Sequence, residues 1–322
     1  MKNWSTTFRG FKRTTHPVPT RVPEAPLKTP SPELRREGDH QQAATVIDHP
    51  WQLGLPQGLK GRFTGKIPFI LAVGGGKGGV GKSMVSANLS SKLAVTGRKV
   101  LALDLDIGGA NLHSYFGIGQ PARNLADAMI LGRSSLADAI LPTRINGLDI
   151  IAGGREEVWG SQKTLTDDIA MGIWQFALNA KSSLGYDIVV FDLGAGTHRD
   201  TTGFFVGAHL GLLTVLPEPT SIENAYMFLR ASLLRLIENC GGHLENSEAA
   251  AQMSQLLTHG LPGRPKPKTC AAGLLELNDV YPKFIQAVQL AIQSRTMGVI
   301  VNQARSQRDS DIAIFMEMIT RS

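Results

Sequence analysis

From residue 67 onward, apolar residues fall into two kinds of pattern. Continuous apolar runs of four to seven residues predict buried strands, and longer stretches with apolar residues three and four positions apart predict helices. The predicted strands cover 67–73, 100–105, 148–152, 187–193, 211–216 and 299–302, and the predicted helices cover 83–95, 161–184, 221–238 and 309–319. Strands that alternate with helices indicate an α/β fold with a mostly parallel sheet and helices on both faces.

Residues 240–296 interrupt this alternation. They contain amphipathic stretches at 248–257 and 280–293, separated by a basic stretch rich in Gly and Pro at 260–268. We predict a helical insertion over 240–296, and we interpret 260–268 as a solvated loop.

The first 66 residues show neither pattern. Eight of the 17 prolines fall there and hydrophobic residues are sparse, so this segment buries too little apolar surface to offset its ordering entropy. We predict a mostly disordered, Pro-rich basic arm over 1–66 and one domain over 67–322. Trp51-Gln52-Leu53 is a local exception, with two interpretations: it docks on the domain or a partner, or it is an exposed aromatic within a linker.

The net charge belongs to the predicted arm. The chain has 33 Lys and Arg against 27 Asp and Glu, a formal charge of +6. Residues 1–66 hold eleven of the basic and five of the acidic residues, so 22 of each remain in the rest of the chain. Any affinity for polyanions such as DNA is therefore expected in the arm.

Composition excludes several classes of protein. With 42% hydrophobic residues and two cysteines, the chain is not collagen-like, disulfide-framework or wholly disordered. No apolar run approaches the roughly 20 residues of a membrane-spanning helix. Cys240 and Cys270 form no CxxC pair, and no apolar stretch follows the first basic residues as in a secretory signal, so we predict free thiols and a cytoplasmic location.

A glycine-rich stretch, 74–83, lies between the first predicted strand and the first predicted helix. Gly76, Gly81, Lys82 and Ser83 have the spacing of a phosphate-binding loop, in which backbone N–H groups surround the phosphates, the lysine reaches the β and γ oxygens and the serine ligates Mg²⁺. The predicted nucleotide contacts here are Gly76, Gly78, Gly79, Val80, Gly81, Lys82, Ser83 and Met84.

The same glycines also fit the G-x-G-x-x-G pattern of dinucleotide sites, and Asp104 lies where such a site places an acid. A dinucleotide site has no need of the Lys82-Ser83 pair, because a diphosphate bridge has no terminal phosphate for the lysine to reach. The sequence therefore favours a nucleoside triphosphate.

Carboxylates end two of the predicted strands. Asp104 and Asp106 close 100–105, and Asp192 lies near the end of 187–193. The carboxyl ends of parallel strands face the ligand crevice, so we expect the three to meet the phosphate-binding loop at one edge of the sheet.

These motifs together resemble the MinD/ParA ATPases, and more closely their flagellar-number regulators of the FlhG/FleN type. The resemblance is carried by Lys77 through Ser83 (a deviant Walker A motif), Asp104 through His113 (switch I), Asp192 through Thr197 (Walker B and switch II), Pro217 through Ser221, and Val301 through Gln303. The resemblance implies a P-loop NTPase of the SIMIBI type that binds ATP and Mg²⁺ and dimerises around two nucleotides.

The resemblance also assigns roles. Lys77 is expected to cross to the nucleotide of the second subunit, Asp106 to position the attacking water and Asn302 to recognise adenine. The residues assigned to hydrolysis are Lys77, Lys82 and Asp106, and those assigned to Mg²⁺ are Ser83, Asp104 and Asp192. Hydrolysis is expected to be slow until a protein partner activates it.

The chain also departs from the family pattern. It ends at Ser322, where relatives continue through a further strand and helix, so we expect a trimmed fold or a fragment. The arm lacks the DQAxxLR motif of FlhG relatives. An apolar stripe at Ile312, Phe315, Met316 and Ile319 favours burial against the sheet over peripheral membrane contact.

Three functional hypotheses follow from these features. The first is a dimerising ATPase switch that positions a cellular structure or sets its number. The second is a ParA-like DNA segregation ATPase that uses the arm. The third is a nucleotide-binding scaffold without hydrolysis, in which His198 and Arg199 disturb the placement of water.

Overall fold

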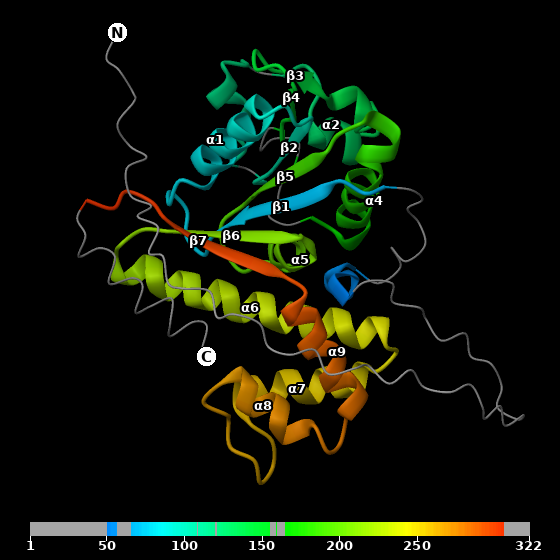
Figure 1. Ribbon diagram of the computed structural model, residues 1–322, viewed down its shortest axis with the longest axis vertical. Coiled ribbons are helices and arrows are strands. Elements are labelled where there is room, and N and C mark those ends of the chain that lie inside the picture. The colour runs from blue at the N-terminus through cyan, green and yellow to red at the C-terminus, as the bar shows by residue number, and fades with distance from the viewer. Residues whose placement is uncertain are drawn as a thin grey trace, which may run out of the picture. The chain divides into compact units, whose positions relative to one another are not determined.

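Seven strands form a single sheet in the order β3-β4-β2-β5-β1-β6-β7 (Figure 1). The computed structural model describes residues 50–56, 66–107, 109–119, 121–154, 159 and 165–305. The strands are β1 Phe69–Gly74, β2 Val100–Leu105, β3 Leu141–Pro142, β4 Leu148–Ile151, β5 Ile188–Leu193, β6 Leu210–Val215 and β7 Thr296–Val301. All neighbours pair in parallel except β3, which runs antiparallel to β4.

Helices cover both faces of this sheet. They are α1 Lys82–Val95, α2 Leu125–Met129, α4 Asp167–Leu184, α5 Arg199–Gly207, α6 Pro219–His243, α7 Ser247–His259, α8 Cys270–Leu277 and α9 Pro282–Gln293, with 3-10 helices η1 Pro50–Gly54, η2 Leu112–Phe116 and η3 Ala137–Ala139. α1 packs on one face, and α4, α5 and α6 pack on the other (Figure 1). The predicted α/β fold is confirmed.

The central strands are apolar on both sides because both sides are covered. In β1, Ile70 and Ala72 join the cluster beneath α4 and α5, while Leu71 and Val73 join the cluster beneath α1. All six residues of β2 are buried, Asp104 among them. Burial on both faces explains why the strands read as continuous apolar runs.

The insertion is helical and has a core of its own. α7, α8 and α9 pack with the second half of α6 around buried apolar side chains that include Met253, Leu274, Phe284 and Val288. Side-chain oxygens of Asn246 and Thr269 cap the amino ends of α7 and α8. Because α6 runs on to His243, the insertion begins inside the last turn of that helix.

Within the predicted arm, the structure describes residues 50–56 and 66, which include the exceptional stretch Trp51-Gln52-Leu53. Residues 50–54 form η1, and Leu53 and Leu55 are each 2% exposed. Because Leu53 is buried in the core of the domain, docking on the domain is the correct interpretation for this residue. Residues 1–49 and 57–65 lie outside the described residues, as does the predicted helix 309–319.

Across the residues that the structure describes, no helix is both long and apolar enough to cross a membrane. Cys240 is buried, Cys270 is half-buried, and both are free thiols.

Candidate functional site

The loop between β1 and α1 has the backbone that phosphate binding requires. Gly79 and Gly81 adopt left-handed conformations, with φ of 77° and 92°. A Cβ on Gly76 would collide with the backbone carbonyl of Asn224 in α6. Glycine is thus required at these positions by backbone conformation or by close packing, and the loop leads into the amino end of α1, where N–H groups are free to bind anions.

Lys82, the first residue of α1, is buried, with 6% of its surface exposed. Burial lowers the pKa of its ammonium group, and the charges of Asp106 and Asp192 partly oppose that shift. A desolvated ammonium beside two carboxylates is a strong partner for an incoming phosphate, because little water has to be removed from it.

Asp104 and Asp192 lie directly opposite each other on the neighbouring strands β2 and β5. One oxygen of Asp104 accepts the N–H of Asp106 at 3.1 Å, and the other accepts the N–H of Leu112 at 2.9 Å. Burial, reinforced by the charge of Asp192, raises the pKa of Asp104 well above its ordinary value. These contacts make Asp104 an anchor for the loop after β2, and its predicted role toward Mg²⁺ stays a prediction.

Asp192 has one carboxylate oxygen in use and one without a protein partner. Ser86 Oγ donates to Oδ1 at 2.9 Å, whereas Oδ2 is buried and accepts no hydrogen bond. Burial raises the pKa of Asp192 to about 6, although Ser83, Ser86 and Lys82 act to lower it. An orphaned buried oxygen near Ser83 fits a divalent cation whose other ligands come from phosphates and water.

This cation would depend on the nucleotide for most of its ligands. Among the described residues, no three His, Cys, Asp or Glu side chains gather into a metal-binding group. Mg²⁺ in phosphate sites commonly takes one or two protein oxygens and completes its octahedron with phosphate and water.

Asp106 is held between two glycine-containing loops. A Cβ on Gly109 would lie 3.0 Å from its Oδ2, and a Cβ on Gly194 would lie 3.0 Å from its Oδ1. Burial raises its pKa, and the nearby Lys82 lowers it. The carboxylate therefore lies where the loops after β2 and β5 approach each other.

Lys77 contacts the amino end of α6 in its own chain. Its Nζ donates to Thr220 Oγ1 at 3.2 Å and lies 3.8 Å from Glu218 Oε2. The Lys77 side chain remains 40% exposed. The two lysines of the loop thus differ sharply, since Lys82 is buried among carboxylates and Lys77 is accessible at the surface.

Asn302, just after β7, is tied to the phosphate-binding loop. Its Nδ2 donates to the carbonyl of Val80 at 2.9 Å, and its own N–H donates to the carbonyl of Val215 at 2.8 Å. The Oδ1 accepts the N–H of Gln303 at 3.0 Å. The structure therefore gives Asn302 a contact with the loop, and adenine recognition stays a prediction.

Sequence reasoning did not single out Ser86 or Asn224. Ser86 follows Ser83 by three positions, which places both on one face of α1 toward Asp192, and this spacing is the signal that was available. The contact of Asn224 with Gly76 carries no sequence signal, because it uses only backbone atoms.

The side chain of Arg199, the first residue of α5, forms ion pairs with α4 and α6. It lies 3.7 Å from Asp167 of α4 and donates to Glu238 of α6 at 3.2 Å. His198 caps α5 without a side-chain hydrogen bond to the helix. The hypothesis of a scaffold without hydrolysis needs Arg199 to act on water, and these ion pairs give it structural partners instead.

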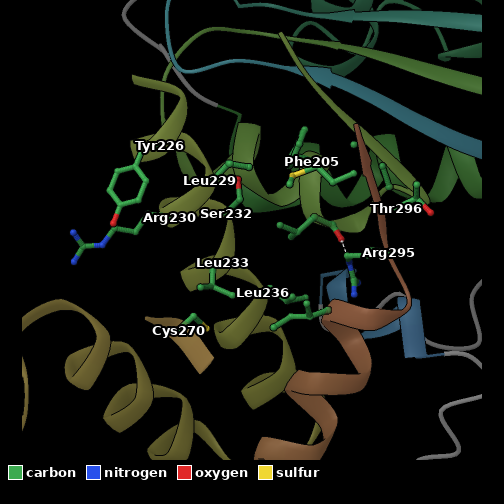
Figure 2. A pocket seen from close by; sticks show the side chains of 15 residues that line it. Phe205, Tyr226, Leu229, Arg230, Ser232, Leu233, Leu236, Cys270, Arg295 and Thr296 are labelled. Carbon is green, nitrogen blue, oxygen red and sulfur yellow. Dashed lines mark hydrogen bonds between the residues drawn. The ribbon is translucent and has the colours of Figure 1, made fainter. Parts of the chain in front are cut away.

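A cavity of about 440 Å³ lies apart from these residues, among α5, α6, α9 and β7 (Figure 2). Its walls are mainly apolar side chains such as Phe205, Leu233 and Leu236. None of the predicted nucleotide or metal contacts lines it. An apolar wall does not suit phosphate, so this cavity and the strand-end site are separate features.

A family model matches most of the chain. The family described as the CobQ/CobB/MinD/ParA nucleotide binding domain matches residues 71–321. The chain belongs to this family. Since the match spans the phosphate-binding loop, Asp104, Asp106, Asp192 and Asn302, the CobQ/CobB/MinD/ParA domain includes every described site residue.

Among similar proteins, antiactivator FleN of Pseudomonas aeruginosa is 37% identical over 50% of this chain and 55% of its own length. Flagellum site-determining protein YlxH of Helicobacter pylori is 35% identical over 50% of this chain and 52% of its own. The chain thus spans about half the length of these relatives. Septum site-determining protein MinD of Pyrococcus horikoshii, solved with Mg-ADP, is 29% identical over 50% of this chain and 63% of its own, with a TM-score of 0.43.

Proposed function

We propose that this chain is an ATP-binding and ATP-hydrolysing switch that dimerises with ATP and regulates the number or position of flagella. The observation that carries the proposal is the contrast between its two loop lysines. Lys82 is buried near Asp106 and Asp192, whereas the Lys77 side chain is 40% exposed and makes surface contacts with Glu218 and Thr220.

In this proposal the nucleotide is held by the loop and the first turn of α1. Backbone N–H groups from Gly76 to Met84 surround the phosphates, and the Lys82 ammonium neutralises charge on the β and γ oxygens. Ser83 and Asp192 would hold Mg²⁺, Asp192 through water, and the bound cation would neutralise charge as the γ-phosphate leaves. Asp106 orients the attacking water, and its raised pKa suits a group that accepts a proton transiently.

Lys77 supplies the connection to a second copy of the chain. Its ion pair with Glu218 is exposed at both ends, and such pairs contribute only about 0–1 kcal/mol, so Lys77 leaves it easily. A phosphate of a second subunit's nucleotide would offer a stronger, charge-assisted partner. ATP would therefore favour the dimer, and a protein partner would act on a slow intrinsic hydrolysis.

The cellular role rests on the relatives. The names antiactivator FleN and flagellum site-determining protein YlxH belong to proteins that share half of this chain. We extend the flagellar role to this chain, with Mg²⁺ as cofactor, a homodimer as the active form and the cytoplasm as its location.

Dimerisation is tested by light scattering on Asp106→Ala protein loaded with ATP and Mg²⁺. We expect dimer with ATP, monomer with ADP, and monomer in both states once Lys77→Ala is added. Lys92→Ala, which removes an exposed lysine later in α1, is the matched control and should still dimerise. Monomer in every state would refute the dimer model.

The flagellar role is tested by expression in a bacterium that lacks its own FleN-type protein. Flagella are counted by electron microscopy. Restoration of the normal count by the unaltered chain, and not by Lys82→Ala, is the expected result. A normal ATPase that leaves the count unchanged would separate the ATPase from any flagellar role.

A second candidate function is non-specific DNA binding of the ParA type, favoured by the net charge of the arm. Because residues 50–56 are packed into the domain, the informative deletion removes 1–49 and leaves them in place. Loss of salt-sensitive DNA binding on that deletion would support this role. Unchanged DNA binding would show that residues 1–49 do not carry it.

A further inference from the structure

Residues 50–56, here called the strap, lie where the two apolar cores meet. Leu53 belongs to the core of the insertion and Leu55 to the core beneath the sheet. Asn239 Nδ2 donates to the carbonyl of Gly54 at 2.7 Å, and His243 Nε2 lies 2.8 Å from the carbonyl oxygen of Leu55. Both contacts are buried, so the strap has a defined seat on α6.

The end of α5 forms a second wall of this seat. A Cβ on Gly54 would collide with the carbonyl of Val206 and with the guanidinium of Arg295, so a larger residue does not fit. Arg295 Nε donates to the same carbonyl at 2.5 Å, and Figure 2 shows the Arg295 side chain reaching it from the junction of α9 and β7. The Val206 carbonyl is therefore the point at which α5, the strap and that junction meet.

The opposite end of α5 adjoins the candidate nucleotide site. The helix starts at Arg199, two positions after the segment 192–197, which begins with Asp192 in the last two residues of β5. Its nine residues span about 13 Å, and all residues of the range 201–207 are buried. A short helix enclosed by a packed core moves as a unit, so a shift at Arg199 reaches Val206.

An ion-pair network gives a second connection between the start of α5 and the strap. Arg199 and Arg235 both donate to Glu238 Oε2, at 3.2 and 3.0 Å. Glu238 directly precedes Asn239, the residue that holds the strap. Because the side chains of Arg199 and Glu238 are both exposed, this route adds only weakly to the direct connection through α5.

We propose that the strap responds to the nucleotide through α5. Closure of segment 192–197 on a γ-phosphate displaces α5, opens the seat at Val206 and releases Leu53 and Leu55, so that the strap is no longer fixed to α6. This inference rests on the proposed function, because it requires that ATP bind. By thermodynamic linkage, ATP must then bind more tightly once the strap is already loosened.

The direct test is hydrogen exchange on the full chain without nucleotide, with Mg-ADP, and with Mg²⁺ and the non-hydrolysable analogue adenylyl imidodiphosphate. The reporter is the Leu55 amide, which donates to the carbonyl of Gln52 at 3.0 Å. We expect exchange at least about fivefold faster with the analogue than with ADP, the lower end of typical coupling between sites. Displacement of a fluorescent nucleotide in the same sample measures binding.

The outcomes separate the two proposals. Bound analogue with unchanged Leu55 exchange overturns the strap coupling and leaves the proposed function standing. Absence of nucleotide binding overturns both.

A reciprocal test weakens the strap and measures nucleotide affinity. Asn239→Ala removes the donor to Gly54 and should tighten binding of the analogue about fivefold. Asn179→Ala, which removes a similar amide that bonds Gln175 within α4, is the matched control and should leave affinity unchanged. Unchanged or weaker affinity in Asn239→Ala contradicts the coupling, and the exchange measurement on the unaltered chain decides it if that variant does not fold.

Discussion

Lys82, Asp104 and Asp192 are buried at the carboxyl edge of the sheet, whereas the insertion buries mainly apolar side chains around Phe284 and Met253. At the sheet edge, burial lowers the pKa of Lys82 and raises the pKa values of Asp104 and Asp192, so it disfavours the charged form of each group. In the insertion, burial removes apolar surface from water and is favourable. The edge is therefore organised for binding at a cost in stability, and the insertion contributes stability without any of the predicted chemistry.

The largest expected effect is a loss of stability from a substitution in the core of the insertion. Phe284, in α9, is 2% exposed, and Phe284→Ala should lower the free energy of unfolding by about 3–5 kcal/mol. ATP affinity of the folded protein should not fall, and loosening of Leu53, which shares the core of Phe284, should if anything raise it. Urea denaturation and a nucleotide titration check both parts, with the exposed neighbour Lys283→Ala as control. A large loss of ATP affinity in folded Phe284→Ala protein would show that the insertion also contributes to nucleotide binding.

Lys82→Ala tests the other region, the carboxyl edge of the sheet. Removing the buried ammonium should reduce ATP turnover by about 10²–10³-fold, the usual cost of losing one preorganised charge in a site. The melting temperature should not fall, because the desolvation of the lysine outweighs its attraction to Asp106 and Asp192. Steady-state ATPase assays and thermal melts, with Lys92→Ala for comparison, measure this. A large loss of stability would show that Lys82 stabilises the fold.

Asp192 extends the comparison to pH. Its pKa of about 6 lies above the ordinary 3.8, so the folded state binds this proton more tightly than the unfolded state. The stability that this group contributes is full below about pH 4 and is lost as pH rises through about 6. Asp192→Asn should therefore be more stable than the unaltered chain at pH 7, by at most about 3 kcal/mol.

The measurement is urea denaturation without nucleotide at several pH values between 4 and 7. The gain of Asp192→Asn over the unaltered chain should grow across that range and vanish at its acidic end. Some pH dependence should remain in the variant, because the pKa of Asp104 is also raised. A gain that is constant with pH would assign it to packing instead of charge.

Asn302→Ala has the smallest expected effect. Loss of one hydrogen bond to Val80, worth about 0.5–1.5 kcal/mol, should weaken nucleotide affinity by about 2- to 13-fold. Titration with both ATP and GTP defines the role further. Equal losses indicate a tie to the phosphate-binding loop alone, and a loss confined to ATP indicates adenine recognition.

The elements that follow from local pattern were predicted well. β2 runs from Val100 to Leu105 as expected, because a continuous buried apolar run ends there at charged residues. Lys82 and the strand-end aspartates lie near one another as expected, because motif spacing and strand ends set their positions, and their roles stay predictions.

Other elements carry no such pattern. α5 was missed because seven of its nine residues are buried, so no polar face gives it a helical period, and Thr201, Thr202 and Gly203 are poor helix formers. α6 continues through Gly241 to His243, beyond its predicted end at 238. Glycine usually ends a helix, but here it allows α7 to approach, because a Cβ on Gly241 would meet the side chain of Ala250.

Contacts between residues far apart in the sequence could not be predicted either. The surface contact of Lys77 with Thr220 joins residues 143 positions apart, and the seat of the strap joins Gly54 and Asn239 across 185. Neither is encoded in a local motif. The sequence marked Leu53 as part of a stretch that could dock, but it did not indicate the surface that receives it, because α6 and α9 are contributed by residues far along the chain.

The position of the strap also has a consequence for the order of folding. During synthesis at roughly 5–20 residues per second, Leu53 and Leu55 leave the ribosome roughly 10–50 s before Arg295, the last residue of their seat, has been made. The first described segment of the chain is thus among the last to reach its native contacts. Its two leucines therefore stay without the contacts of α9 and β7 through most of translation.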